Sequence, residues 1–227
     1  LRDLRPRLSH LYLLCIEILG AIAVYYILAP FDPIVAQGIM ICIICPTATA
    51  AAVVTGKLGG NVASITTYTL LCNIAVAFVI PALFPIIAPS ANHTSFWAAF
   101  SHIMGRIFPL LICPFLLAQL IRLIAPKINS KLSSISGLAF YMWAIALTIA
   151  MGMTVRSLIE EPTDITTLIY LSLGSLIACL FQFFSGKAIG KSTNDTIACG
   201  QSLGQKNTIL AIWICSAYLN PVTALAP

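Results

Sequence analysis

Long, uninterrupted runs of apolar residues recur along the chain, at 11–29, 62–89, 107–121, 135–155 and 166–185. Each is close to the roughly 20 residues that a helix needs to cross the hydrocarbon core of a bilayer. The runs lack the short alternation of apolar and polar residues that is typical of membrane β-strands. The pattern therefore predicts an all-α integral membrane protein.

Two further segments are apolar but interrupted at their middle. Residues 34–57 read IVAQGIMICIICPTATAAAVVTGK, and residues 194–219 read NDTIACGQSLGQKNTILAIWICSAYL. Proline lacks a backbone donor, and glycine weakens a helix by roughly 1 kcal/mol relative to alanine. We expect each segment to cross the membrane as two half-helices with an unwound joint.

Charge fixes the expected orientation. Only 8% of the residues are charged and 59% are hydrophobic, against roughly 25% charged in soluble domains. The basic residues, which give a net charge of +5, are spread among loops, which argues against nucleic-acid binding. By the positive-inside rule, Arg2, Arg5 and Arg7 place the start of the chain in the cytoplasm, and we expect a bacterial inner membrane.

The remaining loops alternate between the two sides of the membrane only if both interrupted segments cross it. Lysine and arginine occur at 122–131 and 186–193, acidic residues occur at 156–164, and 87–94 has no lysine or arginine. A helix followed by a broken crossing then occurs twice, and the two copies have opposite orientations in the membrane, as in inverted-repeat secondary transporters. We expect core helices at 1–86, two panel-type helices at 95–155 and core helices at 164–227. Completing the symmetry needs two helices before Leu1 and one after Pro227, so the chain, which lacks an initial methionine and a signal-peptide pattern, is expected to be a fragment.

Two charged residues fall at membrane depth. Lys206 lies at the middle of its crossing, where a lone charge costs at least roughly 2.5–3.5 kcal/mol. Glu17 is the one acidic residue inside an unbroken apolar run, LYLLCIEILGAIAVYYILA. We expect the two to pair, either as a static salt bridge or as a transport site coupled to substrate or proton movement, since buried lysines can titrate near neutral pH. The remaining alternative is that these charges pair with other groups or with water.

Polar residues surround both joints: Thr47, Thr49 and Thr55 at the first, and Ser202, Gln205, Asn207 and Thr208 at the second. They either satisfy backbone groups freed at the breaks or help half-helix amino ends to bind an anion. Asn61 is interpreted as a helix cap, whereas Asn73, at membrane depth, is a candidate ligand. Arg106 either marks the start of a helix, with 95–105 at the interface, or faces an aqueous cavity, and we favour the first.

The histidines and cysteines indicate no metal site. His10, His93 and His102 fall near helix ends and are far apart in sequence. Most of the eight cysteines, Cys72 among them, lie inside apolar runs and are interpreted as small hydrophobes. Cys42 and Cys45 form a CxxC without a second pair, so we expect neither zinc nor a disulfide framework.

The stretch ICIICPTATAAAVVTGKLGGNVASITTYTLL resembles the fourth-to-fifth-helix region of the bile acid:sodium symporter family, whose consensus is close to CCPGGTASNVVTYLAKGNVALSVALT. GQSLGQKNTILAIWICSAYLNPVTALAP is similar to the ninth helix of that family, of the type IEVGMQNSGLAVALA. The resemblance runs from the third to the ninth helix. It implies a ten-helix, inverted-repeat fold with a panel domain and a core domain containing two crossing, discontinuous helices.

The departures from the family pattern concern sodium. Ala51 and Ala52 replace an adjacent Ser-Asn, Ser202 replaces a glutamate shared by two sodium sites, and Lys206 replaces a glutamine. A third-helix glutamine near the second sodium falls on Glu17, whereas Thr69 still matches a ligand position. The resemblance thus places Glu17 and Lys206 beside one cation position, where an ammonium group can stand in for sodium, and makes conventional sodium coupling doubtful.

These patterns predict a secondary transporter of a small organic anion, with no catalytic residue, metal or cofactor. The expected substrate-binding residues are Thr47, Thr49, Ala51, Ala52, Asn73, Gln205, Asn207 and Thr208. Glu17, Lys206, Ser202 and Thr69 are the expected coupling or salt-bridge residues. The alternative is a membrane receptor or scaffold that no longer transports. An intramembrane enzyme with Lys206 as base lacks a nucleophile motif.

Overall fold

The computed structural model describes residues 5–88, 95–135, 137–160 and 163–227, and every regular element in that part of the chain is helical. Arg2, most of the expected 87–94 loop with His93, and Glu161 lie outside the described residues. In chain order the elements are α1 (Leu8–Leu28), α2 (Pro33–Ile44), α3 (Ala51–Lys57), α4 (Val62–Ile87), α5 (Phe96–Ile124), α6 (Pro126–Ser134), α7 (Leu138–Glu160), α8 (Ile165–Ser192), α9 (Thr196–Gly204), α10 (Thr208–Tyr218) and the 3-10 helix η1 (Pro221–Leu225).

Among the described residues, α1, α4, α5 and α8 are long and apolar enough to cross a membrane, whereas α2, α10 and the apolar part of α7 are shorter. Many large apolar side chains on α5, α7 and α8 face outward, as expected for helices that contact lipid. The all-α membrane class predicted from the sequence is confirmed. The chain is an integral membrane protein.

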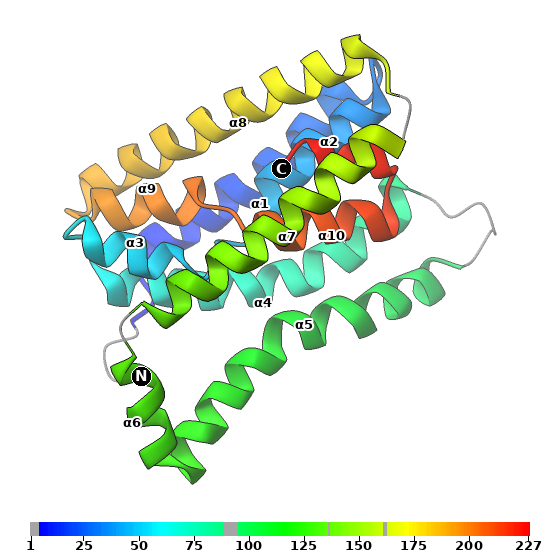
Figure 1. Cartoon of the computed structure of the whole chain (residues 1–227). Coiled ribbons are helices and arrows are strands. Elements are labelled where there is room, and N and C mark those ends of the chain that lie inside the picture. The colour runs from blue at the N-terminus through cyan, green and yellow to red at the C-terminus, as the bar shows by residue number, and fades with distance from the viewer. Residues whose placement is uncertain (1–4, 89–94, 136, 161–162) are drawn as a thin grey trace.

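In Figure 1 most of the helices form one group, α7 runs diagonally across the front of it, and α5 lies below, apart from the others. Within the group, α8 packs along α9 and α2, and α1 packs along α2. Helices α5 and α7 attach separately, since α5 packs on α4 and α7 packs on α10 and η1. Most of the buried apolar side chains, including Tyr68, Phe84 and Leu203, belong to one continuous core.

Polar caps and close glycine contacts set the ends and spacing of the core helices. The Asp32 carboxylate accepts from the backbone N–H groups of Ile34 and Val35 at the start of α2, and Asn61 caps α4 as expected from the sequence. Where α8 meets α9, a Cβ on Gly186 would lie 2.4 Å from the carbonyl oxygen of Cys199. Because the two backbones approach so closely there, no residue larger than glycine fits at position 186.

Helix α5 differs from the expectation. It begins at Phe96, where the Ser95 side chain accepts from the N–H of Ala98, and continues without a break to Ile124. The expected helix start at Arg106 is therefore wrong, and this arginine lies inside the helix. Beyond α5, part of the expected 122–131 loop forms the exposed helix α6.

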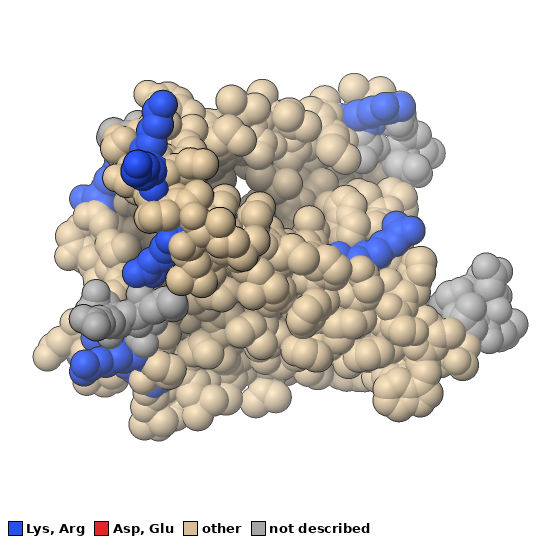
Figure 2. Space-filling view, turned by 90° about the horizontal axis from the view of Figure 1, so that it is seen from below, with Lys and Arg blue, Asp and Glu red and all other residues tan. Residues whose placement is uncertain are grey.

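Basic side chains are unevenly distributed on the surface. Figure 2 shows lysine and arginine gathered mainly toward one end of the molecule, the end at which α6 lies in Figure 1, and no acidic side chain is visible on this face. This asymmetry is the pattern that the positive-inside rule relates to a cytoplasmic side.

Candidate functional site

The two interrupted helices meet at their joints. Helix α2 ends before Pro46 and α3 begins at Ala51, while α9 ends at Gly204 and α10 begins at Thr208. The backbone N–H of Ala48 donates to Gln205 O at 2.9 Å, and the N–H of Asn207 donates to Pro46 O at 2.8 Å. These bonds form a short antiparallel bridge between Thr47 and Lys206, so each joint supplies partners for backbone groups that the other leaves free.

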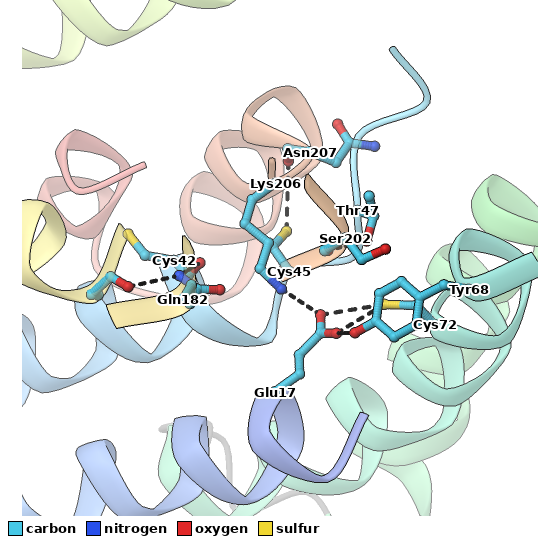
Figure 3. A network of polar contacts seen from close by, with 11 residues as sticks. Glu17, Cys42, Cys45, Thr47, Tyr68, Cys72, Gln182, Ser202, Lys206 and Asn207 are labelled. Atoms are coloured by element: carbon cyan, nitrogen blue, oxygen red, sulfur yellow. Dashed lines mark hydrogen bonds and ion pairs between the residues drawn. The ribbon is translucent and has the colours of Figure 1, made fainter. Parts of the chain in front are cut away.

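Lys206 extends from this bridge toward α1. Its Nζ lies 2.7 Å from Oε1 of Glu17, and the side chains are 10% and 0% exposed, respectively. Figure 3 shows the carboxylate pointing from α1 to the joint, with the lysine approaching from the opposite side. Lone buried charges are costly, and a hydrogen-bonded pair offsets much of that cost. The structure thus brings together the two charges that the sequence placed at membrane depth.

Glu17 has two further donors that the sequence interpretation missed. The Tyr68 hydroxyl donates to Oε2, and the Cys72 thiol lies 3.3 Å from both carboxylate oxygens. Both residues are on α4 and fully buried. Their i, i+4 spacing places them on one helix face, which was the available signal. The interpretation of Cys72 as a simple hydrophobe is corrected, since its thiol contacts a carboxylate.

Side chains also fasten one joint to the other. The Thr47 hydroxyl donates to Ser202 O at 2.7 Å, and the Cys45 thiol lies 3.6 Å from Asn207 O (Figure 3). The Asn207 side chain accepts from the N–H of Leu210 and caps α10. Thr47 and Asn207 therefore satisfy backbone groups at the joints, as one of the two sequence interpretations predicted, whereas the buried side-chain oxygens of Thr55 and Gln205 have no hydrogen-bond partner among the described residues.

A cavity of about 830 Å³ opens beside the joints. Ala48, Thr49, Lys206, Asn207 and Thr208 line it at the joints, α10 forms one wall, and α5 and α7 form the other. The rest of its surface is mostly apolar and includes Trp143 and Trp213, with Arg106 as its second basic residue. A large apolar space with a few polar groups at one place is typical of a small-molecule site.

The family model for the sodium bile acid symporter family matches residues 14–161, which is more than half of the chain. The chain belongs to the sodium bile acid symporter family. No curated protein sequence matches the chain at a significant level. Family membership indicates a transporter of the bile acid symporter kind.

The matched range contains the first broken helix but ends before α8. The correspondence of Ser202 and Lys206 with the family's ninth helix therefore stays a prediction from the sequence. So does the inverted repeat, although the paired joints have the form that such a repeat requires.

The residues present do not fit a sodium ion at the expected family position. Sodium needs oxygen ligands, but an ammonium group is bound to the Glu17 carboxylate. Ala51 is fully buried against Ile65 and Ala198 and offers only a methyl group. The Thr69 hydroxyl donates to Ile65 O within its own helix. Among the described residues, no group of three or more His, Cys, Asp or Glu side chains is placed to hold a metal ion.

The predicted substrate residues separate into two groups. Thr49, Asn207 and Thr208 line the cavity together with Lys206. The others do not line it: Thr47 and Ala51 are buried in the joint and its packing, Ala52 packs beside Ala51, Asn73 is half-buried on α4, and Gln205 contributes its carbonyl to the bridge. Ser202 is buried and accepts from Thr47 through its carbonyl oxygen. Arg106 was not among the predicted site residues, and its position in the cavity corrects the interpretation that we favoured.

Proposed function

We propose that the chain is the transport unit of a secondary transporter for a small organic anion, in which the Glu17–Lys206 pair takes the place of a coupling sodium ion. The proposal includes alternating access, with α5 and α7 as a panel moving against the remaining helices. It also places the N-terminal Arg5 and Arg7 on the cytoplasmic side of a bacterial inner membrane.

The observation that carries the proposal is the 2.7 Å contact between Lys206 Nζ and Glu17 Oε1 at the joint of two broken helices. In transporters with inverted repeats, such joints form the substrate and ion sites near the middle of the bilayer. A fixed ammonium group supplies the positive charge that a bound cation would otherwise bring. Transport that does not depend on sodium follows from this substitution.

The position of the cavity supports the panel movement. One wall belongs to α5 and α7, and the other belongs to α10 and the joints. Since α5 attaches to α4 while α7 attaches to α10 and η1, sliding at these contacts would widen or narrow the cavity without breaking the bridge between the joints.

Flux into proteoliposomes containing the full-length protein tests the proposal. The probes are taurocholate, benzoate and methanesulfonate, each measured with sodium, with N-methylglucamine in its place, and with an imposed pH gradient. We expect uptake of at least one probe at equal rates with and without sodium, and loss of that uptake in Lys206→Ala. Lys191→Ala, an exposed lysine in the last turn of α8, is the matched control.

Uptake that rises steeply with sodium and survives Lys206→Ala unchanged would contradict the proposal. Binding without flux for every probe would instead favour a receptor or scaffold. One observation supports that alternative. The Glu17 carboxylate is hydrogen-bonded to Lys206, Tyr68 and Cys72 at once, an arrangement that would also hold the protein in a single conformation.

A further inference from the structure

Arg106 is a basic side chain inside a membrane-crossing helix. It lies ten residues after Phe96, where α5 begins, which corresponds to about 15 Å along the helix axis. Its side chain is exposed and lines the cavity. Among the described residues it has no hydrogen-bond or ion-pair partner. An arginine at this depth costs at least about 2.5–3.5 kcal/mol unless water or a counter-charge meets it, so the structure calls for such a partner.

The charges around the cavity are not balanced. Lys206 and Arg106 are its basic residues, and none of the residues that line it is Asp or Glu. The charge of Lys206 is neutralised by Glu17, outside the lining. One positive charge therefore remains for an occupant of the cavity, and it is the charge of Arg106.

Arg106 and the joints lie at different places along the cavity. The α7 residues that line it extend from Met142 to Met153, which corresponds to about 16 Å. Phe108, two residues after Arg106, packs on Phe78 of α4, and Tyr218 at the end of α10 packs on Phe84, also of α4. The joint lies beside the earlier α4 residues Tyr68 and Cys72, through Glu17. Arg106 thus lies toward the end of α10 that is far from the joint, and the mostly apolar wall lies between.

We propose that Arg106 is a specificity-determining residue that binds the anionic head of the substrate at the part of the cavity away from the joint, so that the apolar body of the substrate lies along the wall between them. The planar guanidinium group forms two parallel bonds to a carboxylate or sulfonate head, which a single ammonium group does not. Trp213 and Ile209 on α10 and Ala146 and Ile149 on α7 supply apolar contacts for the body. This inference rests on the proposed function, because it assigns the cavity to the substrate.

Two probes that differ only in their charge test the role of Arg106. They are 8-anilino-1-naphthalenesulfonate and N-phenyl-1-naphthylamine, which has the same rings without the sulfonate. Binding to the full-length protein in phosphatidylcholine nanodiscs is followed by quenching of tryptophan fluorescence, since Trp143 and Trp213 line the cavity. We expect Arg106→Gln to weaken binding of the sulfonate by about 10- to 100-fold and to leave the uncharged probe unaffected. Arg106→Lys restores part of the affinity.

Arg122→Gln is the matched control, because Arg122 is an exposed arginine in the last turn of the same helix and does not line the cavity. Equal effects of Arg106→Gln on both probes, or no effect on either, would overturn the assignment. If the difference in sulfonate binding between the wild-type protein and Arg106→Gln disappeared when phosphatidylglycerol replaces phosphatidylcholine, Arg106 would be assigned to a lipid headgroup, which would also overturn the proposal. Selective loss of sulfonate binding in a protein that shows no flux keeps the assignment of Arg106 and contradicts only the proposed transport.

Discussion

Lys206 donates to Glu17 across 189 positions of the sequence, at 2.7 Å, and thereby joins α1 to the contact between the two broken helices. Glu17 is fully buried and Lys206 is nearly so. In the part of the chain that the structure describes, this is the ion pair that lies at the joints, whereas Arg7 and Asp195 pair beside the ends of α1 and α9. The pair therefore both holds α1 against the joints and supplies the charge on which the proposed function depends.

Removal of one partner of this pair is expected to destabilise the protein more than removal of both. Glu17→Gln or Lys206→Met alone leaves a buried charge without its counter-ion, which costs about 3–5 kcal/mol, while the double variant leaves none. Thermal unfolding of all four proteins in one detergent gives the coupling between the residues. Costs that simply add would mean that the two side chains do not interact.

Tyr68→Phe is expected to lower the free energy of unfolding by about 1–3 kcal/mol, since a carboxylate oxygen of Glu17 loses a buried donor. Thr69→Val, on the next residue, removes a hydroxyl that bonds only within its own helix among the described residues and serves as the control. Chemical denaturation of both variants provides the comparison. If the two variants were equally stable, the bond from Tyr68 to Glu17 would contribute no more to the free energy of unfolding than the hydroxyl of Thr69.

Gly186→Ala is expected to separate α8 from α9. The added methyl group would lie 2.4 Å from the Cys199 carbonyl oxygen, and because this is backbone, a helix has to shift at a cost of about 1–3 kcal/mol. Gly152→Ala in α7 meets nothing within 4 Å and is expected to be neutral or stabilising by up to about 1 kcal/mol. Melting temperatures of the two variants test the contrast, and a stable Gly186→Ala protein would argue against this close packing.

Sodium binding is expected to return when the family residues return. A variant with Glu17→Gln, Ala51→Ser, Ala52→Asn, Ser202→Glu and Lys206→Gln replaces the ammonium group by oxygen ligands. We expect its melting temperature to rise by a few degrees, about 2–4 °C per kcal/mol of binding free energy, in NaCl relative to KCl of equal ionic strength. The wild-type protein and the Glu17→Gln, Lys206→Gln double variant are the controls. A response to sodium in the wild-type protein would contradict the proposed substitution of the ion.

Much of this arrangement could be predicted from local sequence patterns. Apolar runs of membrane length predict the helical class, and Pro46 and Gly204, which stand among polar residues in the middle of their segments, predict breaks because proline removes a backbone donor and glycine weakens a helix. Glu17 and Lys206 could be paired because charges at membrane depth need partners. Each of these inferences depends on one segment and on the properties of the bilayer.

The contacts that escaped prediction depend on how distant segments pack. A phenol and a thiol within an apolar run look like core residues until α1 is placed beside α4, so Tyr68 and Cys72 were not expected near Glu17. Arg106 was interpreted as a helix boundary because a charge is costly in lipid. The structure shows that α5 continues past Arg106, whose side chain faces the cavity formed by α5, α7 and α10. Thr47 was expected to face substrate, but its hydroxyl is used by the carbonyl of Ser202.

The bridge between the joints has a consequence for biosynthesis. The Ala48 N–H donates to Gln205 O and the Pro46 carbonyl accepts from the Asn207 N–H, while Glu17 is paired with Lys206. A ribosome makes the first half of this arrangement well before the second. Until α9 and α10 have been made, the Glu17 carboxylate lacks its counter-ion and the Pro46 carbonyl lacks its partner, so we expect the bundle to be completed only after synthesis of both helices.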